Sequence, residues 1–336
     1  MKTDSGKKRI VLFVVFTALL LLTVGASMMV GRYPVSVSDF FHVLFGNGTG
    51  ETQENLSVIL FRVRLPRILL AVLAGASLSA AGAAYQGVFQ NAMASPDILG
   101  ASSGAAFGAA LAIVCHLPSA MITLSAFLFS VLTVFLSWFI SERGHGKKVL
   151  LLILAGMMVS SLFNAGTSLL KLVADPESEL QEITYWLMGS FSGADLADAA
   201  GMILPVLLGL IPLYLIRWRI NLLTLGDEEA RSLGVDVGKT RILVILCSTL
   251  MTAATVAAAG MIGWVGLLMP HLCRKLFGNN YRTLLPASML LGGIFLLLTD
   301  DLSRTLFAVE IPIGILTSLL GAPFFLILLT RRGDSV

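Results

Sequence analysis

Residues 217–241 read RWRINLLTLGDEEARSLGVDVGKTR and lie between two apolar segments that are each long enough to cross a bilayer. We interpret this polar stretch as two short helices separated by Gly226, with the acidic run DEE at the positive end of the second helix dipole. Gly234 follows where a left-handed C-terminal cap is expected. The pattern therefore predicts a compact helical knob, residues 217–241, that projects from a membrane domain.

The knob also carries apolar side chains. A solvated loop with incidental charges is the simpler interpretation of residues 217–241, but exposed leucines favour a partner surface. The apolar residues concerned are Leu222, Leu223, Leu225, Leu233 and Val235. We therefore expect another protein to bind the knob.

The composition excludes a soluble fold. Hydrophobic residues make up 56% of the 336 residues, charged residues make up 13%, and the mean hydropathy is +0.88. A membrane-crossing helix needs about 20 apolar residues. Runs of about this length span residues 10–31, 64–87, 97–115, 119–140, 149–173, 199–216, 241–262, 283–300 and 312–330. The sequence therefore predicts an all-α, polytopic membrane protein.

A tenth candidate crossing, residues 264–277, is short and contains Pro270. Without this crossing, Arg274 and the C-terminal Arg331 and Arg332 would lie outside, which the positive-inside rule disfavours. A short helix is tolerable where neighbouring helices bury its ends. We therefore predict ten transmembrane helices, with both termini and the knob in the cytoplasm and with the knob between helices six and seven.

Two short patterns resemble catalytic motifs but lack the required context. Residues 234–240 resemble a phosphate-binding loop, but three residues separate the glycines where four are needed, and no strand precedes them. Residues 100–104 match G-x-S-x-G inside an apolar helix, without plausible histidine and acid partners. The three cysteines show no metal-ligand spacing. We therefore expect neither catalytic residues nor a metal centre.

Basic residues also cluster on the predicted outer face. Arg62, Arg64 and Arg67 lie together at the outer start of the second crossing, and Arg304 lies in the outer loop before the last crossing. Positive charges kept outside suggest docking of an acidic protein surface or attraction of an anionic ligand. The alternative is that they anchor the helices at the membrane interface.

The loop between the second and third crossings carries amide side chains at the cytoplasmic mouth. Gln90 and Asn91 precede Ser95, a good N-cap, and Pro96, which suits a first helical position. The amides are candidates for a gate, or they satisfy backbone groups at a turn. The sequence leaves both interpretations open.

Small residues recur along the same two crossings. Gly100, Gly104 and Gly108 are spaced every fourth residue, and residues 74–84 are rich in glycine and alanine. Such faces let neighbouring helices approach closely. They fit either a rigid scaffold or a wall that slides.

Ionisable side chains are nearly absent from the predicted crossings, which bears on the energy source. A secondary transporter needs intramembrane groups to carry its coupling ion, and His271 beside Pro270 is the main candidate. A lone histidine near a helix kink is more often structural. The chain has no nucleotide-binding domain of its own, so we expect energy to arrive from another subunit through the knob.

Taken together, these motifs resemble the FecCD and cobalamin-type permeases, the membrane subunits of ABC importers for iron-siderophores, haem and cobalamin. The resemblance covers nearly the whole chain. Its motifs are RLPR at 64–67, residues 86–100, YWLMGS at 185–190, DEEARSLG at 227–234 and residues 263–274. The resemblance implies one transmembrane permease domain over residues 1–336, which contains a cytoplasmic ATPase-coupling loop at 217–241.

The family likeness also implies roles for single residues. Arg64, Arg67 and Arg304 match positions that meet acidic residues on a binding protein. Asn91 and Met93 match the loop that narrows the cytoplasmic gate, although Ala92 and Met93 replace the usual proline and leucine there. The implied ATPase-coupling residues are Leu225, Gly226, Asp227, Glu228, Glu229, Ala230, Arg231, Ser232, Leu233 and Gly234.

The partners implied are two ATP-binding cassette ATPases, a second permease copy or homologue, an extracytoplasmic substrate-binding protein and membrane lipid, without nucleic acid. ATP would bind to the partner subunit, so this chain would be neither an enzyme nor a cofactor carrier. The expected location is the bacterial cytoplasmic membrane. A ferric siderophore is the commonest substrate of the family, with haem or cobalamin as further possibilities. An ion-coupled secondary transporter of a hydrophobic solute and an export permease are the alternatives.

Overall fold

The computed structural model describes residues 2–45 and 51–330, and every regular element among them is a helix. The elements are α1 (Lys2–Met29), α2 (Val37–Phe45), α3 (Glu51–Ser57), the π-helical η1 (Val58–Arg64), α4 (Leu65–Val88), α5 (Ala101–Val114), α6 (Ser119–Arg143), α7 (Lys148–Val173), α8 (Glu179–Met188), α9 (Leu196–Leu223), α10 (Asp227–Ser232), α11 (Val237–Ala259), α12 (Val265–Phe277), α13 (Tyr281–Thr305) and α14 (Ile313–Thr330). The all-α prediction is confirmed for this part of the chain.

Each of the ten predicted crossings forms a helix. These helices are α1, α4, α5, α6, α7, α9, α11, α12, α13 and α14. Within the described residues, six helices are long and apolar enough to cross a membrane: α1, α6, α7, α9, α11 and α13. The chain is therefore a multi-pass membrane protein, whereas the count of ten crossings stays a prediction.

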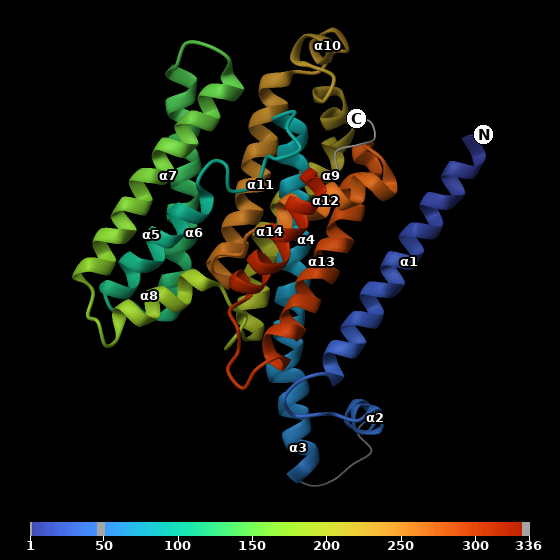
Figure 1. Cartoon of the computed structure of the whole chain (residues 1–336), viewed down its shortest axis with the longest axis vertical. Coiled ribbons are helices and arrows are strands. Elements are labelled where there is room, and N and C mark those ends of the chain that lie inside the picture. The colour runs from blue at the N-terminus through green and yellow to red at the C-terminus, as the bar shows by residue number, and fades with distance from the viewer. Residues whose placement is uncertain (1, 46–50, 331–336) are drawn as a thin grey trace.

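The bundle has two ends of different character (Figure 1). Helix α10 lies at one end, here termed the inner end, and α2 and α3 lie at the opposite, outer end. The first turns of α1 lie on the inner side. Arg331 and Arg332, which were used to predict the tenth crossing from the positive-inside rule, lie outside the described residues. The cytoplasmic placement of the termini stays a prediction.

Helix α4 lies in the middle of the bundle and packs against α9, α11, α12 and α13. A Cβ atom on Gly75 would lie 2.1 Å from the Gly292 carbonyl oxygen of α13, and a Cβ on Gly82 would lie 1.8 Å from the Gly266 oxygen. Neither position can hold a side chain, so the helix backbones touch directly. The close approach expected from residues 74–84 is confirmed.

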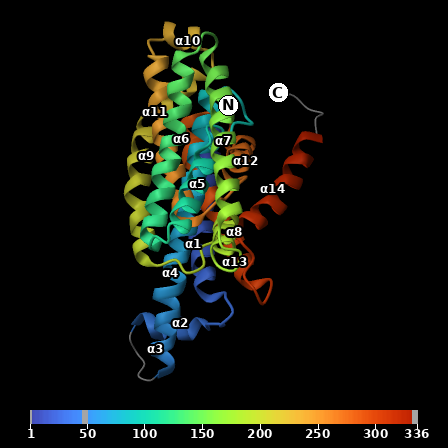
Figure 2. The ribbon, with the colours of Figure 1, turned by 90° about the vertical axis from the view of Figure 1, so that its left-hand side faces the viewer.

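Helices α5, α6 and α7 form a second group, which joins the core mainly through contacts of α5 and α6 with α11. Here too glycine permits contact: a Cβ on Gly104 would lie 2.0 Å from the Thr133 hydroxyl of α6. Figure 2 shows α14 tilted away from the other helices. One flank of the core beside α14 is therefore left uncovered by this chain.

Two predicted helix boundaries were wrong. The knob holds one separate short helix, α10, because α9 continues unbroken to Leu223 where a first short helix was expected. The reason is that no glycine or proline interrupts residues 217–223 and that Ile220 and Leu223 are fully buried. Likewise α5 begins at Ala101 and not near Asp97, because Gly100 adopts a left-handed φ of 83°.

We predict that Gly75→Leu destabilises the protein by about 1–3 kcal/mol, since a larger residue forces α4 and α13 apart. The measurement is thermal denaturation of the detergent-solubilised chain. Gly201→Leu in α9 is the matched control, because no atom lies within 4 Å of a Cβ at that position. Equal melting temperatures for the two variants would contradict the direct backbone contact.

Candidate functional site

The knob at the inner end has the local geometry that its glycines favour. Gly226, with φ of 126°, precedes α10, and a Cβ there would lie 2.2 Å from a Glu229 carboxylate oxygen. Gly234 adopts the left-handed conformation at φ 83°, as expected. Asp236 caps α11 by accepting the Lys239 N–H at 3.0 Å, a bond that holds the pKa of its carboxyl below the usual value.

Burial separates the five apolar residues of the knob, and Leu222 is half-buried against the bundle. Leu223 and Val235 are buried and anchor the knob, so the expectation that they project outward is wrong. Leu225 and Leu233 remain exposed, at 59% and 57% of their surface. These two side chains form an apolar surface that the chain itself does not cover.

An ion pair fixes the knob on the bundle. The Arg241 guanidinium, at the start of α11, donates to both carboxylate oxygens of Asp227 at 2.8 and 3.1 Å. Ala230, in the middle of α10, is fully buried. The knob is therefore a firm extension of α9 and α11.

The loop from Phe89 to Gly100 connects the knob to the interior. Gln90 has an unusual positive φ of 50°, and its side-chain amide donates to the carbonyl of Leu223, the last residue of α9, at 2.9 Å. The Asn91 carboxamide oxygen accepts the Met93 N–H at 2.8 Å, which satisfies a turn, while the Met93 side chain stays exposed. The gate role of Asn91 and Met93 stays a prediction, and the link through Gln90 is a structural feature that the sequence did not indicate.

A cleft of about 540 Å³ lies between this loop, α8, the start of α12 and α14. Its walls are mainly apolar, with a few polar groups contributed by Ser95, Asp97, Thr252 and Ser318. Asp97 is the one carboxylate among the lining residues, and it accepts the Ser102 N–H at 2.7 Å. The Thr252 hydroxyl is buried without a hydrogen-bond partner in the described chain. This cleft can pass a bulky apolar molecule but offers few groups to hold it.

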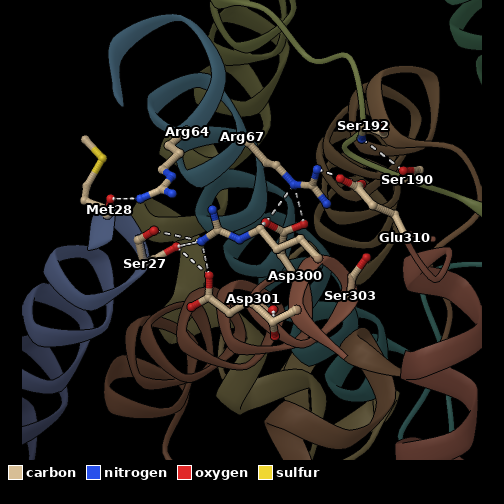
Figure 3. A network of polar contacts seen from close by, with 12 residues as sticks. Ser27, Met28, Arg64, Arg67, Ser190, Ser192, Asp300, Asp301, Ser303 and Glu310 are labelled. Carbon is tan, nitrogen blue, oxygen red and sulfur yellow. Dashed lines mark hydrogen bonds and ion pairs between the residues drawn. The ribbon is translucent and has the colours of Figure 1, made fainter. Parts of the chain in front are cut away.

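The outer end contains a buried network of arginines and carboxylates (Figure 3). The Arg67 Nε donates to Asp300 at 2.8 and 2.9 Å, and its Nη1 lies 2.8 Å from Glu310. Arg304 pairs with Asp301 and donates to the backbone carbonyl of Ser27 at 2.8 Å. The network joins α1, α4, α13 and the loop that leads to α14.

The third arginine of the network, Arg64, has no carboxylate partner in the described residues and donates to two backbone carbonyls. These carbonyls belong to Met28, at the end of α1, and to Tyr33, in the loop that follows. Arg64 therefore ties η1 to the loop after α1.

The expectation that Arg64, Arg67 and Arg304 present open positive charge outside is therefore wrong. All three are buried, with 4–6% of their surface exposed, and Arg67 and Arg304 are paired with acidic residues of the same chain. The physical reason is that a charge at this depth needs a partner, and Asp300 supplies one while itself fully buried. Of the arginines named at the outer end, only Arg62 is exposed.

Sequence analysis missed the acidic half of this network. Asp300 and Arg304 are four residues apart on one helix, a spacing that places opposite charges side by side. This spacing could have predicted that Asp300 is an ion-pair partner of Arg304. Glu310 could not have been assigned, since it meets Arg67 only through tertiary packing.

Two other sequence expectations concern single side chains. His271 forms no hydrogen bond or ion pair with the described residues, so nothing there orients it as a proton relay. The described residues contain no group of three or more His, Cys, Asp or Glu side chains placed to hold a metal ion.

Comparison with known proteins gives consistent matches. A family profile described as the FecCD transport family matches residues 19–331. The molybdate import system permease protein of Haemophilus influenzae is 42% identical over 94% of each chain. A probable iron chelatin transport system permease protein of Helicobacter pylori is 41% identical over 84% of this chain and 85% of that one.

A solved structure is also similar. It is described as an inward-facing conformation of a metal-chelate type ABC transporter, and it superposes with a TM-score of 0.87 at 40% identity. The match covers 95% of this chain and 99% of that one.

We predict that Arg67→Ala costs about 3–5 kcal/mol of stability, because it leaves Asp300 buried with its strongest charge partner removed. Thermal denaturation in detergent measures the loss. Arg62→Ala, on the exposed side of the same segment, is the control and should have almost no effect. Adding Asp300→Asn to Arg67→Ala should restore part of the stability; no recovery would show that Arg67 acts otherwise than by neutralising Asp300.

Proposed function

Because the chain belongs to the FecCD transport family, we propose that it is the membrane permease subunit of an ABC importer, driven by separate ATPase subunits. The observation that carries this proposal is the firmly held knob with its uncovered apolar surface at Leu225 and Leu233. In this proposal residues 225–234 of each permease subunit bind one ATPase subunit, and ATP binds only to the ATPases. The proposed location is the cytoplasmic membrane of a bacterium, with the inner end in the cytoplasm.

A mechanical route leads from the knob to the cleft. Movement of the ATPases shifts α10 together with the start of α11, because the Asp227–Arg241 ion pair joins them. The end of α9 moves with them, because only residues 224–226 separate it from α10 and the two helices are in contact. The carbonyl of Leu223 then displaces Gln90, and with it the loop that carries Asn91, Met93 and the cleft wall. This link supports a gate that follows the ATPase cycle.

We propose that a second copy, or a close homologue, completes the pathway. The cleft lies beside α14, whose residues Ile315 and Leu319 line it and are exposed. Pairing two such open clefts face to face would enclose a central passage. The complete importer would then contain two permease subunits and two ATPases.

The proposed substrate is an iron chelate, with a ferric siderophore ahead of haem or cobalamin. The relatives named for molybdate and for iron chelatin are 42% and 41% identical to this chain, although the first match covers more of it, so we base the choice of substrate on the cleft. A cleft of about 540 Å³ in one subunit suits a bulky chelate, and its single carboxylate, Asp97, disfavours a small oxyanion. Family membership disfavours the ion-coupled alternative.

We propose that the outer network assists docking of a substrate-binding protein, because an acidic residue of that protein replaces Glu310 as an ion-pair partner of Arg67. Glu310 is 28% exposed, and Arg67 has one buried nitrogen, Nη2, without a partner in the described chain. An acidic side chain of the binding protein can therefore replace Glu310 at Arg67 without leaving Asp300 unpaired. In this form Arg67 takes part in docking although it is buried, whereas the docking roles of Arg64 and Arg304 stay predictions from the family likeness.

The test of assembly is native mass spectrometry of the tagged chain extracted from its own membrane. We expect two permease subunits with two ATPases. Leu233→Asp should lose the ATPases, because it places a charge in the apolar contact, while the permease stays folded. Leu306→Asp, an equally exposed leucine at the outer end of α13, is the control and should retain them.

The same assembly in proteoliposomes tests the substrate. With its binding protein and ATP it should accumulate a radiolabelled ferric siderophore and not molybdate. A wild-type assembly without ATPase would overturn the importer proposal, whereas uptake of molybdate alone would overturn only the substrate.

Partner exchange at Arg67 predicts that Glu310→Gln tightens docking of the binding protein by about fivefold, because the internal competitor is removed. Surface plasmon resonance on nanodisc-embedded importer measures the affinity. Glu179→Gln, which removes another carboxylate from the outer half of the protein, is the control. Equal affinities for the two variants would exclude the exchange.

A further inference from the structure

We propose that a crevice between α1, α9 and α13 binds an anionic phospholipid, with an acyl chain between the helices and the headgroup on three arginines. The crevice is separate from the cleft beside α14. The proposed lipid site requires only that the chain lies in a bilayer, so it is independent of the proposed transport function.

The crevice has a volume of about 440 Å³ and nearly all of its wall is apolar. Each of the three helices contributes to it, and the only polar side-chain group in the wall is the Tyr214 hydroxyl. The lining residues are Phe13 of α1, Leu210, Ile211, Tyr214 and Leu215 of α9, and Pro286, Met289 and Leu290 of α13. Such a wall accepts a hydrocarbon chain and rejects a hydrated ion.

Each wall helix carries an arginine about one turn nearer the inner end than one of its lining residues. Helices α1 and α13 run outward from the inner end, and α9 runs toward it (Figure 1). The arginines are Arg9, four residues before Phe13, Arg282, four before Pro286, and Arg217, three after Tyr214. A separation of three or four residues keeps side chains on one helix face.

Three contacts at the inner end of the crevice support a common location for the three arginines. The Arg217 guanidinium lies 3.7 Å from the centroid of the Tyr214 ring, against the wall itself. Arg9 Nη2 lies 3.8 Å from the position of a Cβ on Gly278, in the turn before α13. The Asn221 side chain of α9 accepts the Tyr281 N–H, next to Arg282, at 2.8 Å.

These arginines lack the neutralising partners that other arginines of the chain have. No described carboxylate lies within ion-pair distance of Arg9, Arg217 or Arg282, whereas Arg67 and Arg304 are paired. Three positive charges without a described carboxylate partner therefore lie about one helical turn beyond the lining of an apolar crevice, toward the inner end. Basic pockets between transmembrane helices recognise anionic lipid headgroups in this way.

The crevice favours a lipid over a free phosphate ion or a protein helix. A phosphate ion would use the arginines and leave the apolar wall empty. A helix of another protein would occupy the crevice, but it would need acidic residues at the same membrane depth as the three arginines. An anionic phospholipid uses both features, because its acyl chain contacts the apolar wall and its headgroup contacts the arginines.

The test is native mass spectrometry of the delipidated, full-length chain titrated with dioleoyl phosphatidylglycerol or dioleoyl phosphatidylcholine. We expect one phosphatidylglycerol to bind with clear preference. Arg282→Gln should weaken that binding about fivefold, and Arg9→Gln, Arg217→Gln and Arg282→Gln together on the order of 100-fold, at about 1 kcal/mol for each basic residue.

The matched control removes three positive charges elsewhere at the inner end, through Arg143→Gln, Lys147→Gln and Lys148→Gln. Arg143 also lies over an aromatic ring, that of Phe139 at 4.0 Å, which parallels Arg217 on Tyr214. The control should bind phosphatidylglycerol as the wild type does. Equal binding of the two lipids by the wild type, or equal losses in both triple variants, would overturn the proposal.

A second pair of variants tests the acyl chain. Ile211→Trp fills the crevice from α9 and should lower phosphatidylglycerol binding severalfold, whereas Leu208→Trp, equally exposed but outside the lining, should not. If glycerol 3-phosphate competes fully with the lipid and Ile211→Trp has no effect, the site binds phosphate alone and the proposal fails.

Discussion

Direct backbone contact along α4 is the constraint on which the rest of the bundle depends. A bilayer supplies no hydrophobic force between helices, so their association rests on close packing and internal hydrogen bonds. Gly75 and Gly82 bring α4 against α13 and α12 at distances that no side chain would permit. At its inner end α4 is also tied to α12, because Gln86 donates to the Leu267 carbonyl at 3.3 Å. The cleft, the loop from Phe89 to Gly100 and the outer network are all placed by this helix.

Charge serves two different purposes in this protein. At the outer end, arginines and carboxylates neutralise one another inside the protein, and the ion pairs hold α4, α13 and the following loop together. At the inner end, Arg9, Arg217 and Arg282 lie about one helical turn from the residues that line an apolar crevice, without carboxylate partners in the described chain. The first arrangement stabilises tertiary structure, and the second leaves positive charge for a ligand.

The link between knob and cleft is short. One hydrogen bond, from Gln90 to the Leu223 carbonyl, joins the end of α9 to the loop whose later residues line the cleft. The positive φ of Gln90 indicates that the loop is held in this conformation by its surroundings. A motion applied to Leu225 and Leu233 from outside would therefore reach the cleft wall through few intermediates.

The sequence by itself determined the membrane class, the apolar helices and the position of the knob, because apolar runs of fixed length and glycines at helix ends act locally. It also indicated that residues 74–84 pack closely. Only the tertiary structure decided that Arg64, Arg67 and Arg304 are buried, that Glu310 reaches Arg67, and that α9 extends to Leu223. The reason is that the spacing of residues along the sequence indicates only their positions on one helix. The charge partner and the burial of a residue depend on helices that are distant in the sequence.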